Sequence, residues 1–499
     1  MILSHYMLEK QPSLKRELGL LDSTLIVIGS MVGSGIFIVS ADISRTLGSP
    51  AYLILTWVLT GFITLMAALS YGELAGMMPK AGGQYVYLRE SYNPLVGFLY
   101  GWTFFLVIQT GTIAAVAIAF AKYTAVLYPW FGEKNILFSI GPWHITTNQC
   151  LAVVSVIVLT YINTRGVKTG KRIQLIFTLA KTIALIGLIF LGIFIARNAQ
   201  AIQINFMHFW HSPFTTQKTG WGVVVKNLEG SALWIAFGGA MVGSLFSSDA
   251  WNNITFTAGE VKNPARNIPL SLFLGTLCVT LIYILVNISY LLVLPITGSP
   301  EGKDVLSRGI MFATDDRVAT ASSFMIFGPP AVIIMAILIM ISTFGCNNGL
   351  ILSGARVYYA MAKDRLFFAK AGTLNKQSVP AFALIIQCIW TCLLCFSGGY
   401  GALLDYVIFA VLIFYIVTVG GIFILRKKQP DMPRPYKAFG YPFIPILYMV
   451  LASVIALDLL IVKWETSRWG ALIVLTGIPI YYLSRNYFGH DKSTAPDEN

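Results

Sequence analysis

The sequence has few charged residues for its length. Only 11% of its 499 residues are Asp, Glu, Lys or Arg, whereas soluble domains contain about a quarter. So few charges cannot cover the roughly three soluble domains that this length would otherwise predict. The hydrophobic share of 56% also excludes a disordered chain, a collagen, a coiled coil and a secreted disulfide scaffold.

Cysteines are too few and too scattered for a disulfide framework. All six except Cys150 lie deep in apolar runs, so no extracellular disulfide pair is predicted. Cys388, Cys392 and Cys395 share one helix face by their i, i+4, i+7 spacing. A thiol metal site is one interpretation of this face, and small membrane-buried side chains are the favoured one.

Motifs of ATP hydrolysis and of common hydrolases are missing. The segment GVKTGKR at 166–172 lacks the spacing of a Walker A loop. Neither a G-x-S-x-G elbow nor an H-E-x-x-H pair occurs. The sequence therefore argues against an ATP-driven pump and a recognisable membrane hydrolase. No catalytic residue, cofactor or metal ion is predicted.

Long apolar runs are abundant, and the mean hydropathy is +0.72. Runs of this length predict helices that span a lipid bilayer. The predicted fold class is an all-α membrane protein with about 12 transmembrane helices. The twelve segments are 21–47, 51–77, 94–128, 149–163, 173–196, 231–257, 270–294, 328–360, 380–397, 401–425, 441–462 and 470–484.

The basic residues indicate the orientation of this bundle. An even number of spans puts both ends on one side, and the loops on that side carry most of the Lys and Arg. By the positive-inside rule, both termini are predicted to be cytoplasmic, in a plasma (inner) membrane. The net charge of +13 then reflects basic loops rather than nucleic-acid binding. A polar block at 80–93 is predicted as a short amphipathic segment on the inner face.

The first and sixth spans are both interrupted by small or polar residues. The first reads IGSMVGSGIF at 28–37, and the sixth reads GSLFSSDAW at 243–251. Because they lie five spans apart, they enter the membrane in opposite directions, as in an inverted repeat whose broken helices face one midplane site. The predicted organisation is a cytoplasmic tail at 1–20, a first repeat (spans 1–5) at 21–196, an extracellular loop at 197–230, a second repeat (spans 6–10) at 231–425, spans 11–12 at 426–485 and a cytoplasmic tail at 486–499.

Gly33, Ser34 and Gly35 are the first candidate site. A helix can open where side chains are this small. The freed amides would then face one spot with positive dipole character, which suits an anionic carboxylate. Helix packing through the small-residue pair Gly29 and Gly33 is the alternative. The matching break in span six favours the functional interpretation.

Asp249 is the second candidate, because an acid in the middle of an apolar span is costly and suggests function. Its carboxylate is predicted to hold a substrate amine or cationic side chain, or alternatively to cap the broken helix. Pocket-lining or gating roles are predicted for the neighbouring Phe246, Ser248, Trp251 and Asn252.

Lys181 is the third candidate. It lies eight residues into an apolar run and far from its outer end, so it can only partly snorkel. A cation site between helices, proton exchange and inner-leaflet snorkelling are the alternatives. In a cation site, its ammonium is expected to meet carbonyls near Ile28 and Gly29 and hydroxyls such as Ser342 or Thr343.

With these residues in place, the sequence resembles the L-type amino acid transporter branch of the amino acid–polyamine–organocation superfamily. The resemblance runs from about residue 19 to residue 485. It is carried by six blocks in order, IGSMVGSGIF (28–37), YGELAGMMPKAGGQYVYLRE (71–90), IQLIFTLAK (173–181), WNNITFTAGEVKNPARNIPLSL (251–272), FGCNNG (344–349) and RKKQPDMPRPYK (426–437).

The resemblance implies a fold and a substrate site. The fold is LeuT-like, with five plus five inverted spans and two more. Substrate carboxylate binding is implied at the Ser34 and Gly35 amides, and amine binding at the carbonyls of Met31, Phe246 and the Asp249 position. Phe246 matches a gating aromatic. Lys181 matches a lysine that stands where sodium-coupled relatives bind a cation, which implies sodium-independent exchange.

Two departures from the family pattern limit what carries over. Animal members bond a glycoprotein heavy chain through a cysteine between spans three and four, but here 130–149 has none and Cys150 lies beyond it. No disulfide-linked heavy chain is therefore expected, and a free-standing prokaryotic transporter is favoured. Ser247, Ser248 and Asp249 stand where many relatives have Ala, Tyr and Gly, so the substrate range of the family does not carry over to this chain.

The sequence thus predicts a secondary active transporter that exchanges L-amino acids by alternating access. A proton-coupled amino acid or amine symporter and a membrane amino acid sensor are the alternatives. The predicted partners are small amino acid substrates and the lipid bilayer, and a homo-oligomer is left open.

Overall fold

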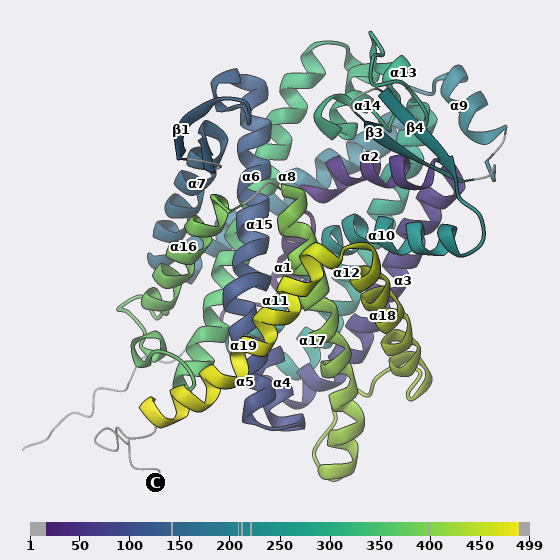
Figure 1. Cartoon of the computed structure of the whole chain (residues 1–499). Helices are drawn as coiled ribbons and strands as arrows, with labels where there is room; N and C mark the ends of the chain where they lie inside the picture. The colour runs from purple at the N-terminus through teal and green to yellow at the C-terminus, as the bar shows by residue number, and fades with distance from the viewer. Residues whose placement is uncertain are drawn as a thin grey trace, which may run out of the picture.

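The computed structural model describes residues 16–140, 143–207, 209–210, 213–219, 222–397 and 400–488. Most of both predicted tails therefore lies outside the described residues. Helices make up nearly all of the regular structure (Figure 1). The first half contains α1 (Leu20–Met31), α2 (Gly35–Leu47), α3 (Pro50–Met77), α4 (Gln84–Ser91), α5 (Pro94–Thr103), the π-helical η1 (Phe104–Ile108), α6 (Gln109–Leu127), η2 (Pro129–Phe131), α7 (Thr147–Thr164), α8 (Val167–Phe194) and α9 (Ala199–Phe206).

The second half continues the helical pattern. It contains α10 (Ser231–Ser247), α11 (Asn253–Phe256), η3 (Ala258–Glu260), α12 (Pro264–Val293), α13 (Val305–Arg308), η4 (Thr314–Asp316), α14 (Val318–Phe327), α15 (Pro330–Lys363), η5 (Ala369–Gly372), α16 (Ala381–Cys395), α17 (Tyr400–Lys428), α18 (Phe443–Val462) and α19 (Trp464–Phe488). Proline begins α3, α5, α12 and α15, where its missing N–H is not needed.

Each of the twelve predicted spans coincides with a helix or a pair of helices. In the described part of the chain, eight helical segments are long and apolar enough to cross a membrane. Helices α1 and α2 are together long and apolar enough for a ninth span, although the chain bends by 41° between them. The apolar helices α10 and α16 are shorter, with 17 and 15 residues. The all-α multi-span fold class is confirmed.

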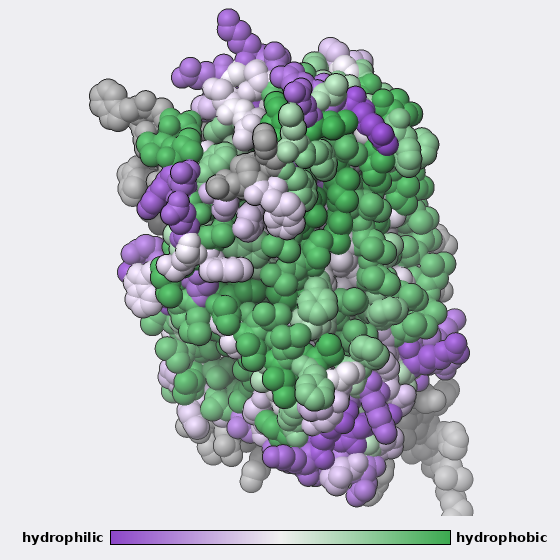
Figure 2. All heavy atoms as spheres, turned by 90° about the vertical axis from the view of Figure 1, so that its right-hand side faces the viewer, coloured by the Kyte–Doolittle hydropathy of each residue, from purple (hydrophilic) through white to green (hydrophobic). Residues whose placement is uncertain are grey.

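The surface of the bundle has the layering that a membrane requires. Figure 2 shows a broad apolar belt between hydrophilic ends. Large apolar side chains are exposed on several helices, among them Ile183, Leu281, Ile389 and Leu457. In water these groups would be unfavourable, whereas lipid tails cover them without loss. The belt therefore marks the lipid-facing surface.

Both predicted helix breaks are present. Helix α1 ends at Met31, and Val32 leaves the helical region with φ −74° and ψ 87° before α2 begins at Gly35. Helix α10 ends at Ser247, and α11 begins at Asn253. Between them, Ala250 has a φ of +64°, a left-handed conformation that non-glycine residues rarely adopt. The interruptions predicted from small and polar residues are confirmed.

The two ends of the bundle carry different elements. The predicted extracellular loop folds into α9 and a hairpin of β3 (Phe214–Thr219) and β4 (Gly222–Asn227), in antiparallel register from Phe214–Asn227 to Thr219–Gly222. In Figure 1 these elements lie at the top with α13 and α14, and α4 and α5 lie toward the bottom. A second hairpin, β1 (Ile136–Ile140) and β2 (Trp143–Thr146), precedes α7.

Helix α15 is central to the packing, because it contacts α1, α6, α7, α8 and α16. Helix α12 in turn contacts α1, α3 and α8. The segment at 80–93 forms the short helix α4. Arg89 and Glu90 are partly exposed, as an amphipathic segment requires, but the polar Gln84 is buried together with Tyr85 and Leu88. Gln84 bonds to other parts of the bundle instead of water.

Candidate functional site

The two helix breaks contact each other directly. A Cβ added to Gly35 would lie 1.9 Å from Ser247 Oγ and 3.1 Å from Ser247 Cα. Tyr283 of α12 connects the breaks, because its hydroxyl lies 3.1 Å from the Met31 carbonyl and 3.1 Å from the Ser247 carbonyl. One phenolic proton serves both acceptors. The breaks predicted from sequence therefore form one site at the centre of the fold.

Donors from neighbouring helices reach every carbonyl at 29–33, where α1 opens. Cys346 Sγ lies 3.1 Å from the Ser30 carbonyl. Ser342 Oγ lies 3.3 Å from the carbonyls of Val32 and Gly33. With Tyr283 on Met31 and Lys181 on Gly29, all five acceptors have partners outside α1. Buried carbonyls need such donors when the helical ladder ends.

Lys181 lies inside the bundle, 1% exposed. Its Nζ donates to the carbonyls of Gly29 at 2.6 Å and Val32 at 2.5 Å. No ion pair with a carboxylate is found for it among the described residues. The expected contact with Gly29 is present. The snorkelling alternative is not what the geometry shows, since the ammonium is held by backbone oxygens.

Two expected partners of Lys181 are wrong. The Ile28 carbonyl accepts the Val32 N–H of its own helix at 2.9 Å. Thr343 Oγ1 donates to the Ile339 carbonyl within α15. Ser342 takes part indirectly, because its hydroxyl shares the Val32 carbonyl with the ammonium.

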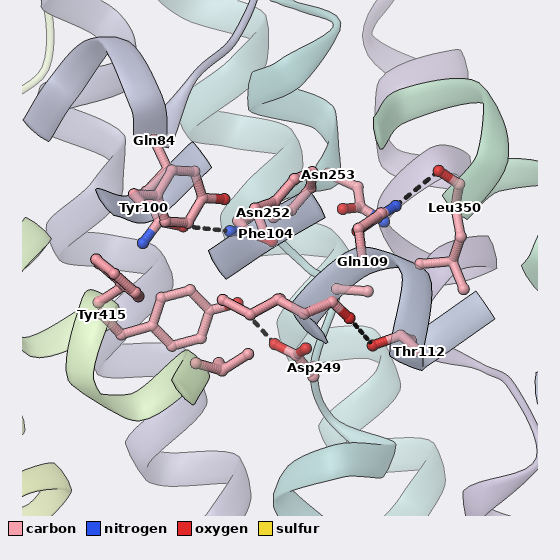
Figure 3. A pocket seen from close by; sticks show the side chains of 14 residues that line it. Gln84, Tyr100, Phe104, Gln109, Thr112, Asp249, Asn252, Asn253, Leu350 and Tyr415 are labelled. Carbon is pink, nitrogen blue, oxygen red and sulfur yellow. Dashed lines mark hydrogen bonds between the residues drawn. The ribbon is translucent and has the colours of Figure 1, made fainter. Parts of the chain in front are cut away.

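Asp249 lies within the span-six break, between the end of α10 and the start of α11. Its Oδ1 accepts the hydroxyl of Tyr415 in α17 at 2.6 Å (Figure 3). The carboxylate also interacts with the backbone at Ala250, so the capping and substrate-binding alternatives both stay open. It borders two small cavities with volumes of about 10 and 20 Å³, each enough for about one water.

Polar side chains surround the first of these cavities. Asn252 Nδ2 donates to Gln84 Oε1 at 3.0 Å, and Gln84 Nε2 donates to Thr418 at 3.0 Å. Gln109 Nε2 donates to the Leu350 carbonyl at 2.6 Å. Asn253 Nδ2 is buried and has no hydrogen-bond partner among the described residues. Figure 3 shows Gln84, Gln109, Asn253 and Tyr415, which come from α4, α6, α11 and α17, around this cavity.

The predicted gate residues are divided between the two cavities beside Asp249. Ser248 and Trp251 border the second cavity, whereas Asn252 borders the first. The Trp251 ring packs edge-on against Tyr71 at 4.8 Å and beside Tyr415 at 5.3 Å. Phe246 is 7% exposed. Gly33, Ser34 and Gly35 border neither cavity; Gly33 packs against Cys346 instead.

Sequence reasoning missed Tyr283, Tyr415, Gln84 and Gln109. Gln109 stands in an apolar run, and a polar residue in a span is a usable functional signal. Gln84 belongs to the polar block at 80–93, which the sequence predicts as an amphipathic segment on the inner face and not as part of the site. The tyrosines carry no such signal, because their rings also belong in an apolar core.

The end of the bundle that holds α4 is closed by buried polar contacts. Arg356 Nε lies 3.0 Å from Glu260 Oε1, and these side chains are 0% and 1% exposed. The N-terminal segment covers this pair, because Leu18 pairs with Val261 as a parallel bridge. Beside it, Tyr85 donates to Asp364 at 2.8 Å. Burial and the Asp364 carboxylate together raise the pKa of the Tyr85 phenol.

Comparisons with known proteins agree with this architecture. The family described as "Amino acid permease" matches residues 18–481. The "Large neutral amino acids transporter small subunit 2" of Homo sapiens is 30% identical over 94% of this chain and 81% of its own length. The "Asc-type amino acid transporter 1" of Mus musculus is 28% identical, with the same coverage. The "b(0,+)-type amino acid transporter 1" of Homo sapiens is 27% identical over 96% of this chain and 90% of its own length. The chain belongs to the amino acid permease family.

Proposed function

We propose that this protein is a secondary active transporter that exchanges L-amino acids across a membrane without sodium. The observation that carries the proposal is the pair of opposed helix breaks, held apart from lipid at the centre of the bundle. Such breaks present backbone N–H and C=O groups to a substrate at a depth where the lipid tails provide no polar group. The names of the relatives support amino acids as the substrate class.

The proposed substrate site uses the residues of both breaks. The amides of Gly33, Ser34 and Gly35 bind the carboxylate, and the carbonyls of Met31, Phe246 and Asp249 bind the amine. In the described arrangement Gly35 abuts Ser247, so a substrate enters only when the two breaks separate. Alternating access then consists of opening this contact toward one side at a time. The five-plus-five inverted repeat is proposed as the framework for that motion.

Lys181 is proposed to replace a bound sodium ion. Its ammonium is bound by the backbone carbonyls of Gly29 and Val32, which are hard oxygen ligands of the kind a cation prefers. A tethered cation makes the site permanently filled. Proton-coupled symport is the second candidate, and the hydrogen bond between Asp249 and the buried Tyr415 is the observation that favours it.

The proposal includes the orientation of the transporter in its membrane and its subunit composition. Both termini are placed in the cytoplasm, and the protein in a plasma membrane. The human relative is called a small subunit, but the 130–149 loop of this chain lacks cysteine, and Cys150 lies within α7. We therefore propose a transporter without a disulfide-linked heavy chain.

Purified protein in liposomes tests this function. Vesicles loaded with unlabelled amino acid should take up radiolabelled amino acid, whereas empty vesicles should not. If empty vesicles take up amino acid only when an inward proton gradient is imposed, the protein is a proton-coupled symporter and not an exchanger. Binding without any uptake would instead indicate a sensor. Testing all twenty amino acids would define the substrate range.

A further inference from the structure

A large groove lies between α3, α12 and the loop that joins α17 to α18, and it shares no lining residue with the two cavities beside Asp249. Its volume is about 660 Å³, well above that of the two cavities beside Asp249. Apolar and aromatic side chains form its walls, namely Leu69, Pro269, Leu270, Phe273, Tyr436 and Phe439. The last two belong to the loop between α17 and α18. The groove therefore lies where three elements meet at one end of the bundle.

The groove is preformed because its loop wall is fixed. A Cβ added to Gly72 of α3 would lie 2.8 Å from the Tyr436 ring, so glycine permits this close approach. The Ala438 N–H donates to Glu73 Oε2 at 2.7 Å. Arg426 pairs with the same carboxylate at 2.7 Å, and Arg434 lies within 3.4 Å of it. These contacts hold the loop against α3.

The rim of the groove is positively charged. Arg266 and Lys437 both border it, and both are exposed. Neither forms an ion pair with a carboxylate in the part of the chain that the structure describes. The nearby Glu73 is already shared by two arginines. An anionic group placed at this rim would meet two free cations.

The apolar surface continues from the groove along α12. Leu274, Leu281 and Leu285 are 39%, 52% and 41% exposed, and they belong to the lipid-facing surface. Phe439 is 66% exposed at the loop. An amphiphile whose head binds the rim could thus run its chain through the groove and into the bilayer. Figure 2 shows the same order of surfaces, hydrophilic at the ends and apolar between them.

We propose that this groove binds one anionic glycerophospholipid. Arg266 and Lys437 bind the phosphate head, and one acyl chain lies between Leu69, Leu270 and Phe273. The lipid comes from the leaflet at the α4 end of the bundle, which is cytoplasmic under the proposed orientation. A zwitterionic lipid has the same chains but no net negative charge, so the two cations select against it.

Native mass spectrometry of the full chain tests the site. Protein in detergent is mixed with phosphatidylglycerol or with phosphatidylcholine of the same chain length. One phosphatidylglycerol should be retained per chain, and phosphatidylcholine should bind much more weakly. Equal retention of the two lipids would overturn the proposal.

Two variants separate the head site from the chain site. Arg266→Gln combined with Lys437→Gln should weaken phosphatidylglycerol binding about thirtyfold, from the attraction typical of two basic residues near a membrane surface. Lys370→Gln combined with Lys376→Gln removes the same charge from another exposed loop and should change binding little. Equal losses in the two double variants would show that only net charge matters, against the proposal.

Leu270→Trp fills the groove and leaves both cations in place. It should reduce retention of phosphatidylglycerol while size-exclusion chromatography shows the wild-type profile. Unchanged retention would mean that no chain occupies the groove. Because no transport is measured, failure of the exchange function would leave these results unaffected.

Discussion

Replacing Lys181 with alanine is the most direct perturbation of the proposed mechanism. The substitution removes the ammonium that donates to the carbonyls of Gly29 and Val32. The Val32 carbonyl retains Ser342 at 3.3 Å. The Gly29 carbonyl has no such replacement, because the Gly33 N–H that would continue the helix donates to Met31 instead. One buried acceptor is thus left unpaired.

An unpaired buried acceptor costs about 1–3 kcal/mol. Lys181 holds the opened end of α1, which in this arrangement contacts the span-six break. We expect the cost to fall on this closed arrangement and not on open states, where water reaches the carbonyl. The equilibrium should therefore shift by about 5- to 150-fold toward open states. Exchange must pass through the closed state, so it should slow by a similar factor. Binding of the substrate backbone should weaken less, because the ammonium does not touch the substrate amides.

The assay compares exchange and binding in the same preparation. Lys181→Ala should bind substrate in a scintillation proximity assay and exchange it slowly in loaded vesicles. Thr182→Ala, at the next position of α8, controls for damage to the helix and should exchange normally. Wild-type exchange should be equal in sodium and in choline buffers. Full-rate exchange by Lys181→Ala, or a clear sodium requirement of the wild type, would refute the reasoning.

Four further substitutions test the breaks. Gly35→Leu should abolish uptake at normal membrane expression, because any Cβ there meets Ser247; normal transport would remove the carboxylate site from these amides. Asp249→Asn should change the ratio of cationic to neutral amino acid uptake, and a uniform fall for all substrates would identify the residue as a cap. Tyr415→Phe keeps the Asp249 carboxylate, so it should change that ratio less than Asp249→Asn does. Tyr283→Phe removes the shared donor at a cost of about 0.5–1.5 kcal/mol, so α1 should exchange its amide hydrogens faster; unchanged protection would show that the bridge does not hold the breaks closed.

The helix breaks could be predicted from sequence because glycine and aspartate in mid-membrane are rare. The left-handed Ala250 could not, since alanine is an ordinary helix former and only the surrounding packing selects its φ of +64°. Burial of α4 was also missed. Its polar residues suggested a surface segment, but Gln84 bonds across the bundle to Asn252 and Thr418. Satisfied pairs of this kind are invisible until the fold is known.

The contacts that close the site escape prediction for the same reason. Tyr283 is separated from Met31 by 252 positions and from Ser247 by 36, and Tyr415 from Asp249 by 166. Nothing local to these tyrosines distinguishes them from core aromatics. The sequence could identify which helices break, but not which side chains hold the broken ends.

A closed site with shared donors explains how such a helix break can exist without a substrate. Each carbonyl at 29–33 has a partner from another helix, so the open turn carries no unpaired acceptor. Two of these partners are shared, because Tyr283 serves two carbonyls with one proton and Ser342 does the same. In the proposed site, a substrate amine takes the Met31 carbonyl while Tyr283 keeps its bond to the Ser247 carbonyl. The exchange of partners then leaves neither the phenolic proton nor the Ser247 carbonyl unpaired.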